Sequence, residues 1–554
     1  MMHSIPQIVG KHYFRQWAGV DFHTGRTRWC NEGASRVATR SWNKDRASKR
    51  IDAKISELPV KDIEIREYVR DTDLTNLPRN VAYRVNGAHL YADILNLSDM
   101  LHVTAVEGET CHRRTLRFLN LHYRAVYRIL QRVDAIFVDF HNQRLYSVVS
   151  KPYDAEAGRV HKAVAMGQLI IDVLAQTGED ADHPPAKVRI GIDTGMALAV
   201  NNGRRGHREP LFLGVPANHA AKRAGGGRAA GIYLTNEART AIGLKKADNE
   251  DTTALTSAEI ATSQEKAKLG VTADEIVKEW KDDLEKNPIG VFEFTAHTPP
   301  FSTLDIEALS VKNSRRQDAT SVYADIDGFT AFVGANIASD NSAKHVVRSL
   351  HVLRSELDAV LHSDFCGRKV RFIGDCVHGL TVEGTAQTTD EKETISNLTL
   401  CAGGMRSSFD LALTKLKEDG TDASSLGLAV GFEFGPMTVT RLGMKGDLVR
   451  CSVSRGVLTA ESEQSRCSGT ETALGSIAYS KGSDAVKAVF GTTRKRAELT
   501  YDVAVKELSD KNDTSAKAAR AMESSGLLKP ATSAVAPFSF PNRPTGPAKP
   551  TGFA

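Results

Sequence analysis

Two aspartates in the second half of this 554-residue chain occupy positions suited to chemistry on phosphates. Asp325 ends an apolar run that predicts a buried strand, and a turn and a helix start follow at 328–330. A carboxylate in such a place, with the main-chain carbonyl of Ile326, could hold a metal ion, and the N–H groups of the turn could bind phosphates. Asp375 follows Gly374 at the tip of a predicted hairpin. Taken separately, Asp325 could instead cap the next helix and Asp375 could simply form the turn.

The elements around these aspartates occur twice in the chain. Asp93 and Asp325 stand in the same tetrapeptide, Tyr-Ala-Asp-Ile, 232 positions apart. Gln143 and Asp375 stand in two predicted hairpins at the same offset of 232. A third match begins at Arg189, at an offset of 240. Three matches in the same order at a nearly constant offset indicate an internal duplication.

Each unit is predicted to run strand, helix, hairpin, helix, strand pair, helix and strand. This order predicts an α+β sandwich with helices on one face of a largely antiparallel sheet. The first long helices are expected at 113–132 and 342–363. An N-terminal extension is expected at 1–80 and a first unit at 81–300. The first unit is expected to contain a charged helical insertion at about 245–287 and to close with a strand at 289–294. A polar linker at 310–320 is expected to lead to a second unit at 318–510, and a disordered tail rich in Pro, Ser and Gly to follow at 530–554.

The two aspartates together resemble the metal-binding pair of the class III nucleotidyl cyclases. In that family an Asp ends the first strand, with Gly-Phe-Thr soon after it, and a second Asp follows Gly at the next hairpin. The resemblance implies tandem ferredoxin-like α/β sandwich domains that form an intramolecular pseudo-heterodimer. Two Mn²⁺ or Mg²⁺ ions about 3.5–4 Å apart would stabilise the attacking and leaving oxygens. The resemblance further implies that the metal ligands are Asp325, Ile326 and Asp375. It implies that the substrate-binding residues include Gly328, Phe329 and Thr330.

The family also places an Asn and an Arg on a helix of the partner domain, where they stabilise the transition state. In this sequence Asn218 stands in the place of the Asn, and Lys222 in the place of the Arg. Residues four apart share one face of a helix. Lys offers a point charge but not the bidentate fork of Arg, so either Lys222 or the adjacent Arg223 could contact the phosphate. An amphipathic helix with ordinary surface polar residues is the alternative interpretation.

The two units lack complementary parts of the family's site. The second unit has Val457 in place of the Asn and Glu461 in place of the Arg. The first unit keeps Asp93 but has Gln143 where the second metal-binding Asp belongs. The second unit therefore keeps the metal-binding half, and the first unit keeps the transition-state half. Because cyclase domains pair head-to-tail, we expect one complete site between the units and one incomplete mirror site.

The family recognises the base with two residues, one in the strand before the hairpin and one before the Asn helix. In the first unit these positions hold Asp139 and Leu211, which form neither the adenine nor the guanine pair of the family. An ionised Asp accepts hydrogen bonds but cannot donate them. Asp139 could accept from N3–H of uracil, the amino group of cytosine or N1–H of guanine, or it could be an ordinary strand residue.

Residues 207–222, in which Pro-Ala-Asn is followed by Ala-Ala-Lys, resemble the pyrimidine cyclases of the bacterial Pycsar anti-phage systems. The resemblance favours UTP as the substrate and implies that 3′,5′-cyclic UMP activates an effector in antiviral defence. Cytidylate and guanylate cyclase activity stay open, as does a different class, a non-catalytic regulatory protein that binds nucleotide. A GGDEF-type diguanylate cyclase is disfavoured because its Gly-Gly-Asp-Glu-Phe signature is missing at the hairpin.

The composition, with 41% hydrophobic and 25% charged residues, is typical of a soluble globular protein. No apolar run approaches the roughly 18 residues that cross a bilayer, and the start of the chain lacks a signal-peptide core, so we expect a cytoplasmic protein without a membrane partner. The net charge of +5 predicts no nucleic-acid partner, and the seven scattered cysteines fit reduced thiols. Paired internal domains predict a monomer, and a higher oligomer stays open.

Overall fold

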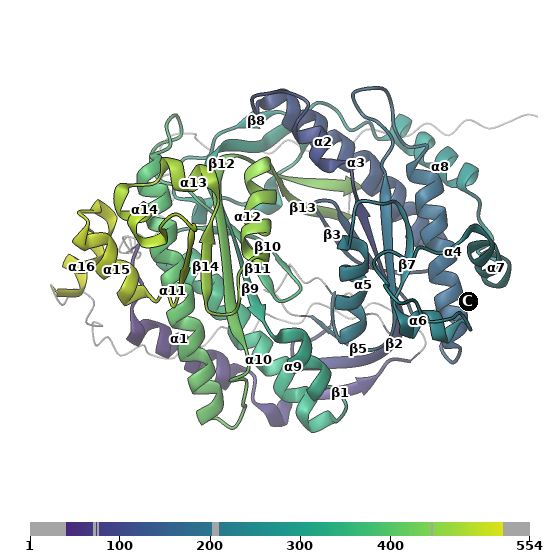
Figure 1. Ribbon diagram of the computed structural model, residues 1–554, viewed down its shortest axis with the longest axis horizontal. Helices are drawn as coiled ribbons and strands as arrows, with labels where there is room; N and C mark the ends of the chain where they lie inside the picture. The colour runs from purple at the N-terminus through teal and green to yellow at the C-terminus, as the bar shows by residue number, and fades with distance from the viewer. Residues whose placement is uncertain are drawn as a thin grey trace, which may run out of the picture. The chain divides into compact units, whose positions relative to one another are not determined.

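The computed structural model describes residues 40–69, 72, 74, 77–201, 210–444 and 447–524. The predicted tail and the first 39 residues of the predicted N-terminal extension lie outside the described residues. Within the described ranges the chain forms two β-sheets that follow one another along the sequence, and helices pack on each of them (Figure 1).

The first sheet lies in the first half of the chain. Its strands are β1 (Glu64–Glu67), β2 (Val81–Ile94), β3 (Ile136–His141), β4 (Arg144–Val149), β5 (Val188–Asn201), β6 (Pro210–Leu213) and β7 (Gly231–Leu234). They are ordered β3-β4-β2-β5-β6, with β1 beside β2 and β7 beside β5. The pairs β1–β2 and β5–β7 are parallel, and the other pairs are antiparallel. Because β2 is central, most of its residues are buried, as its apolar sequence predicts.

The second sheet repeats this order. Its strands are β8 (Phe294–Thr295), β9 (Ser314–Asp327), β10 (Arg368–Ile373), β11 (Cys376–Thr381), β12 (Gly427–Met444), β13 (Asp447–Val453), β14 (Glu471–Leu474) and β15 (Lys495–Ala497). They are ordered β10-β11-β9-β12-β14-β15, with β13 beside β12 and β8 beside β9. The hairpin β10–β11 lies against β9, just as β3–β4 lies against β2. The repeated order confirms the predicted α+β class and the duplication.

Two long helices pack on each sheet, α3 and α4 on the first and α10 and α11 on the second. Each presents apolar residues at helical spacing to the core, as Leu116, Leu119 and Tyr123 do on α3. The long helices are α3 (Glu109–Arg132), α4 (Glu156–Leu174), α10 (Asp340–Ala359) and α11 (Glu391–Glu418). The shorter helices are α2 (Leu97–Leu101), α5 (Val215–Gly225), α6 (Asn236–Ala241), α9 (Phe329–Asn336), α12 (Arg455–Ser465), α13 (Ser476–Lys481), α14 (Asp484–Phe490), α15 (Tyr501–Asp510) and α16 (Thr514–Ser524).

The described part of the N-terminal segment is attached to both units. Helix α1 (Lys44–Glu57) packs on α10 and α11 of the second unit. There Arg50 donates to Glu356 at 2.6 Å and to Asp364 at 2.9 Å. Strand β1 pairs with β2 of the first unit. Residues from α1 to β1 therefore connect the second unit to the first.

The charged segment predicted at 245–287 forms two helices, α7 (Ser257–Ala267) and α8 (Ala273–Lys286). A capping box starts each helix. They pack on α4 and α3, where the buried Trp280 donates its Nε1–H to the carbonyl of Leu121 at 3.0 Å. Among the described residues, no helix is both long and apolar enough to cross a bilayer. The described cysteines are free thiols, as predicted.

The predicted closing strand and linker were wrong. Residues 289–293 form no strand, and β8 covers only two residues, which pair with the start of β9 in the second sheet. The apolar pattern at this place arises because Ile289 and Phe292 are buried in the core of the first unit without strand pairing. Strand β9 begins at Ser314, so the second part of the predicted linker belongs to the second sheet.

Candidate active site

The two predicted metal ligands lie beside each other at one end of the second sheet. Strand β11 pairs with β9 so that Val377 is opposite Ala324. Asp375, in the turn just before β11, therefore lies next to the end of β9 that carries Asp325. Gly374 has a φ of 58°, and glycine adopts this left-handed conformation without steric cost. The tight hairpin thus places the second carboxylate near the first.

The surroundings of the two carboxylates favour a cation. Both side chains are half-buried. Burial raises the pKa of Asp325 to about 6, and the charge of Asp327 adds to this effect. Burial and then the charge of Asp325 raise the pKa of Asp375 well above its ordinary value. The pair therefore fits a divalent ion, whose charge would offset the repulsion and whose preference for oxygen donors is met.

The turn after Asp325 forms the start of α9. Gly328 has a φ of 79° and stands at the N-cap position without a side-chain cap, which leaves the first N–H groups of the helix for other partners. Phe329 is buried and anchors the helix in the core, while the buried Ile326 precedes the turn on β9. Thr330 reaches the other unit, because its hydroxyl accepts a hydrogen bond from the Asn218 carboxamide.

Asn218 lies on α5 of the first unit and faces the second unit, as its bond to Thr330 shows. Lys222, one turn later, is exposed. The side chain of Arg223 forms ion pairs of 3.1 Å with Glu250 and 3.2 Å with Asp251. Of the two cations that the sequence left open, Arg223 is therefore engaged within the first unit, and the role of Lys222 stays a prediction.

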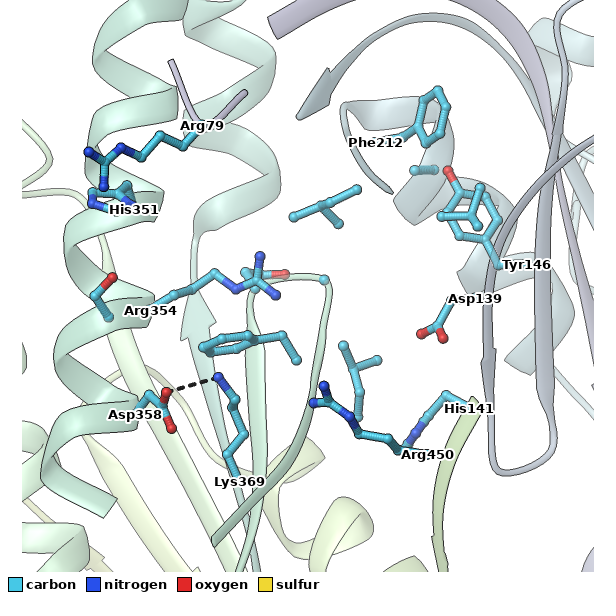
Figure 2. A pocket seen from close by; sticks show the side chains of 18 of the residues that line it. Arg79, Asp139, His141, Tyr146, Phe212, His351, Arg354, Asp358, Lys369 and Arg450 are labelled. Atoms are coloured by element: carbon cyan, nitrogen blue, oxygen red, sulfur yellow. Dashed lines mark hydrogen bonds and ion pairs between the residues drawn. The ribbon is translucent and has the colours of Figure 1, made fainter. Parts of the chain in front are cut away.

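A cavity of about 1200 Å³ lies between the units (Figure 2). It brings together four of the predicted site residues, which are Asp139, Leu211, Asn218 and Asp375. The other predicted residues are not among those that line it, and they are Lys222, Asp325, Ile326, Gly328, Phe329 and Thr330. Two of these lie next to lining residues, since Asp325 adjoins Asp375 and Thr330 binds Asn218.

Asp139, the predicted base-recognition residue on β3, forms an ion pair with Arg371 on β10. Arg371 is 1% exposed, and its guanidinium also donates to the carbonyls of Phe140 and Arg450. Sequence reasoning missed Arg371, although it stands 232 positions after Asp139 and is therefore its counterpart in the repeat. Leu211 on β6 is half-buried at the cavity wall. Asp139 thus faces the cavity, and its carboxylate is paired with a cation of the second unit.

Other lining residues were also missed. They come from α10, from β10 and from the N-terminal segment, and include Arg79, His351, Arg354, Asp358, Lys369 and Phe372. No motif marks them in the sequence. Their only signal is the spacing of His351, Arg354 and Asp358, which puts these three on one face of a helix.

The mirror site, at the equivalent place on the other side of the interface, holds an ion pair. Arg144, beside Gln143 at the hairpin of the first unit, donates to Glu461 on α12 of the second unit at 2.7 Å. Asp93 is buried nearby, and its pKa is raised to about 6 chiefly by burial, against the opposing charge of Arg144. At the predicted broken site, opposite charges of the two units therefore face each other.

A second group of possible metal ligands consists of Glu107, Cys111 and His112. His112 Nε2 lies 2.8 Å from a Glu107 carboxylate oxygen, and its Nδ1 accepts from Arg316 of the second unit at 3.1 Å. The same carboxylate oxygen accepts from the backbone N–H of Arg455 at 2.7 Å. Two arginines and satisfied hydrogen bonds make this group a contact between the units rather than a cation site.

The chain is similar to proteins of known class. A curated uridylate cyclase from Pseudomonas aeruginosa is 57% identical over 487 residues, which are 87% of this chain and 94% of that protein. One from a Rhizobium species is 37% identical over 434 residues, 75% of this chain and 82% of that protein. A solved structure, a class III adenylyl cyclase-like ATP-binding protein from Pseudomonas aeruginosa, is 57% identical with a TM-score of 0.83 and covers 84% of this chain and 99% of its own. No protein-family model matches the chain.

The repeated sheets, the interface cavity and these similarities define a class III nucleotidyl cyclase, and so an enzyme that acts on nucleotides. The predicted class is therefore confirmed. Within this class the chain belongs to the family represented by the two curated uridylate cyclases.

Proposed function

We propose that the chain converts UTP to 3′,5′-cyclic UMP and diphosphate at a single composite site between its two units. The observation that carries the proposal is the cavity, which takes Asp375 from the second unit and Asp139 and Asn218 from the first. At the equivalent mirror position Arg144 and Glu461 form an ion pair instead. The names of the two curated relatives support uridine as the nucleoside.

In this reaction the ribose 3′ oxygen bonds to the α-phosphorus, and the bond from that phosphorus to the β-phosphate oxygen breaks. The electron pair leaves with diphosphate, and the 3′ proton passes to solvent. Asp325, Ile326 and Asp375 would hold two Mg²⁺ or Mn²⁺ ions, which supply charge stabilisation for the attacking and leaving oxygens. Asn218 would donate to the α-phosphate with its second N–H, because the bond to Thr330 orients the carboxamide. Lys222 would add a positive charge.

The remaining predicted residues would hold the substrate. The N–H groups after Gly328, at the start of α9 and next to Phe329, would contact phosphate oxygens. Asp139 would accept N3–H of uracil while Arg371 fixes its carboxylate, and Leu211 would pack against the base. CTP and GTP are the alternative substrates, since each also offers an N–H group to an ionised Asp.

A non-catalytic nucleotide-binding protein is the second candidate. It is favoured by one observation, the name of the solved relative, which calls that protein ATP-binding. In that case the cavity would bind a nucleoside triphosphate, and no cyclic product would form.

We further propose that the cyclic nucleotide is a second messenger in antiviral defence. The support is the resemblance of the segment that ends at Lys222 to the pyrimidine cyclases of anti-phage systems, although residues 202–209 lie outside the described part of the chain. Because both halves of the site belong to one chain, the active unit is proposed to be a monomer.

Incubation of the purified protein with each of the four nucleoside triphosphates and Mn²⁺ tests the activity. Mass spectrometry of the products should show cyclic UMP as the dominant product, with equimolar diphosphate. Dominant cyclic AMP or GMP would contradict the assignment to uridine. Binding of a triphosphate without any cyclic product would favour the second candidate. A parallel incubation with Mg²⁺ shows which of the two ions serves better.

A further inference from the structure

The cavity continues past the metal-binding hairpin along a wall that the proposed reaction does not yet use. This wall belongs to α10 and β10 of the second unit and includes Arg354, Lys369 and Phe372. The guanidinium carbon of Arg354 lies 3.8 Å from the centroid of the Phe372 ring, and the ammonium of Lys369 lies 3.9 Å from it. One aromatic ring thus orients two cations in the same cavity.

The two cations are held at a fixed place beside Asp375. Asp358, one turn after Arg354 on α10, accepts a hydrogen bond from Lys369 at 2.9 Å (Figure 2). Arg354, Lys369 and Asp375 all line this one cavity. Figure 2 shows Arg354 and Lys369 on one side of the cavity and Asp139 on the other.

A triphosphate needs cations beyond the metal ions. Two divalent ions shared with two aspartates leave part of the triphosphate charge unbalanced, and the charge on diphosphate grows as it leaves. Positioned cations stabilise such developing charge. Arg binds phosphate oxygens through a planar fork, and an aromatic ring holds that fork in one plane. Arg354 stacked on Phe372 has these properties.

We propose that Arg354 and Lys369 bind the β- and γ-phosphates of the substrate and then the leaving diphosphate. This inference rests on the proposed function. With the base at Asp139 and the α-phosphate near Asn218 and Asp375, the other two phosphates extend toward α10. Arg354 and Lys369 are then ligands of the diphosphate group, and Phe372 and Asp358 position them.

Isothermal titration calorimetry with diphosphate and Mg²⁺ on the full chain tests this inference without any turnover. Arg354→Gln and Lys369→Met should each weaken diphosphate binding about tenfold, which corresponds to one lost charge-assisted contact. Binding of UMP, which has no β- or γ-phosphate, should stay within about twofold in both variants. Arg132→Gln removes a cation that pairs with Glu279 and does not line the cavity, and should change neither ligand.

Steady-state kinetics give a second readout. Arg354→Gln should raise KM for UTP and the inhibition constant of diphosphate by about the same tenfold factor, and Arg354→Lys should recover part of the loss. Equal weakening of UMP and diphosphate, or unchanged diphosphate binding, overturns the inference. If the wild-type protein forms no cyclic product yet binds diphosphate through Arg354, the proposed function fails, and the assignment of Arg354 as a ligand of the β- and γ-phosphates holds. Thermal melting identifies a variant that fails to fold, and Lys369→Met then carries the test.

Discussion

The candidate site and the mirror site occupy equivalent positions at the interface of the two units, and they differ in the charges that face each other. In the candidate site the half-buried carboxylates of Asp325 and Asp375 repel each other, and Asp375 lines the same cavity as Asn218. In the mirror site Arg144 and Glu461 attract each other at 2.7 Å. The first arrangement is electrostatically incomplete without a cation, whereas the second is complete within the protein.

This difference shows how a duplicated interface can separate function from stability. Repelling, half-buried carboxylates cost folding free energy, and proteins retain such features where a ligand uses them. An ion pair across the mirror site instead joins the two units. The same fold position would thus serve binding in one copy, as proposed, while it joins the units in the other. The comparison can be tested by variants at both sites, as follows.

The largest effect is expected at the hairpin that carries Asp375. Asp375→Asn keeps the shape but removes the charge, and should lower cyclic product formation about a thousandfold or more, because a lost metal ion removes several kcal/mol of charge stabilisation. The thermal midpoint should stay equal or rise, since a buried repulsion is relieved. Product quantified by mass spectrometry and a melting curve measure both. An equal loss of activity in Asp93→Asn would show that the mirror site is also catalytic.

Sequence motifs identified Asp325 and Asp375 because the residues that mark each of them lie next to it in the chain. Asp325 and Asp375 are each defined by a strand end and a turn, and the repeat predicted how the strands align. Arg371 and Arg354 have no such local mark, because their roles depend on which side chain the other unit or a neighbouring strand brings near them. A single sequence carries no direct signal for such contacts.

The mistaken strand at 289–293 has a related cause. A short run rich in apolar and aromatic residues is typical of a strand, but Ile289 and Phe292 bury their side chains in the core of the first unit without any backbone pairing. Burial alone therefore produced the pattern that was interpreted as a strand. The identity of the cation near the α-phosphate depends in the same way on side-chain direction, and the motif could not distinguish Lys222 from Arg223.

The next largest effect is expected at Asn218. Asn218→Ala should lower turnover about 10²- to 10³-fold, as loss of one positioned donor does. KM for UTP should change little, because such a donor acts on developing charge. Thr330→Val, which removes the acceptor that orients Asn218, should have a smaller effect in the same direction. A large rise in KM with unchanged turnover would mean that Asn218 only binds the substrate.

Mixing two inactive chains sharpens this point. Asn218→Ala and Asp375→Asn damage opposite halves of the proposed site. If the halves pair only within one chain, the mixture should stay as inactive as its components. Recovery of activity would show that the site forms between chains, and sedimentation of the mixture would then reveal the oligomer.

A moderate effect is expected at Asp139. Asp139→Asn replaces an acceptor by a group that can also donate, so the ratio of CTP to UTP turnover should rise about tenfold. Stability should also fall by about 3 kcal/mol, because Arg371 is buried and would lose its charged partner. Urea unfolding and competition between the two nucleotides measure these changes. Asp139→Lys is a poorer test, since it places a second cation against Arg371.

A double variant supplies the control for Asp139→Asn. Asp139→Asn combined with Arg371→Gln removes both charges and should recover most of the lost stability. If the double variant also recovers the preference for UTP, the unpaired charge of Arg371 in the single variant, and not the loss of the Asp139 carboxylate, changed the choice of base. If the preference stays changed, Asp139 itself contacts the base.

The smallest effect on activity is expected in the mirror site. Burial raises the folded-state pKa of Asp93 to about 6, so the ionised form of Asp93 is less stable in the folded protein than in the unfolded chain. The resulting penalty is absent below the unfolded-state pKa and is fully present above about pH 6. Asp93→Asn removes it, and should therefore stabilise the protein by about 1–3 kcal/mol at pH 7 but hardly at pH 4. Arg144 keeps its partner Glu461 in this variant, so cyclic product formation should stay within about twofold. Unfolding in urea at the two pH values measures the change. A variant that is less stable at pH 7 than the wild type would mean that the ionised Asp93 supports the ion pair, and that the mirror site needs all three charges.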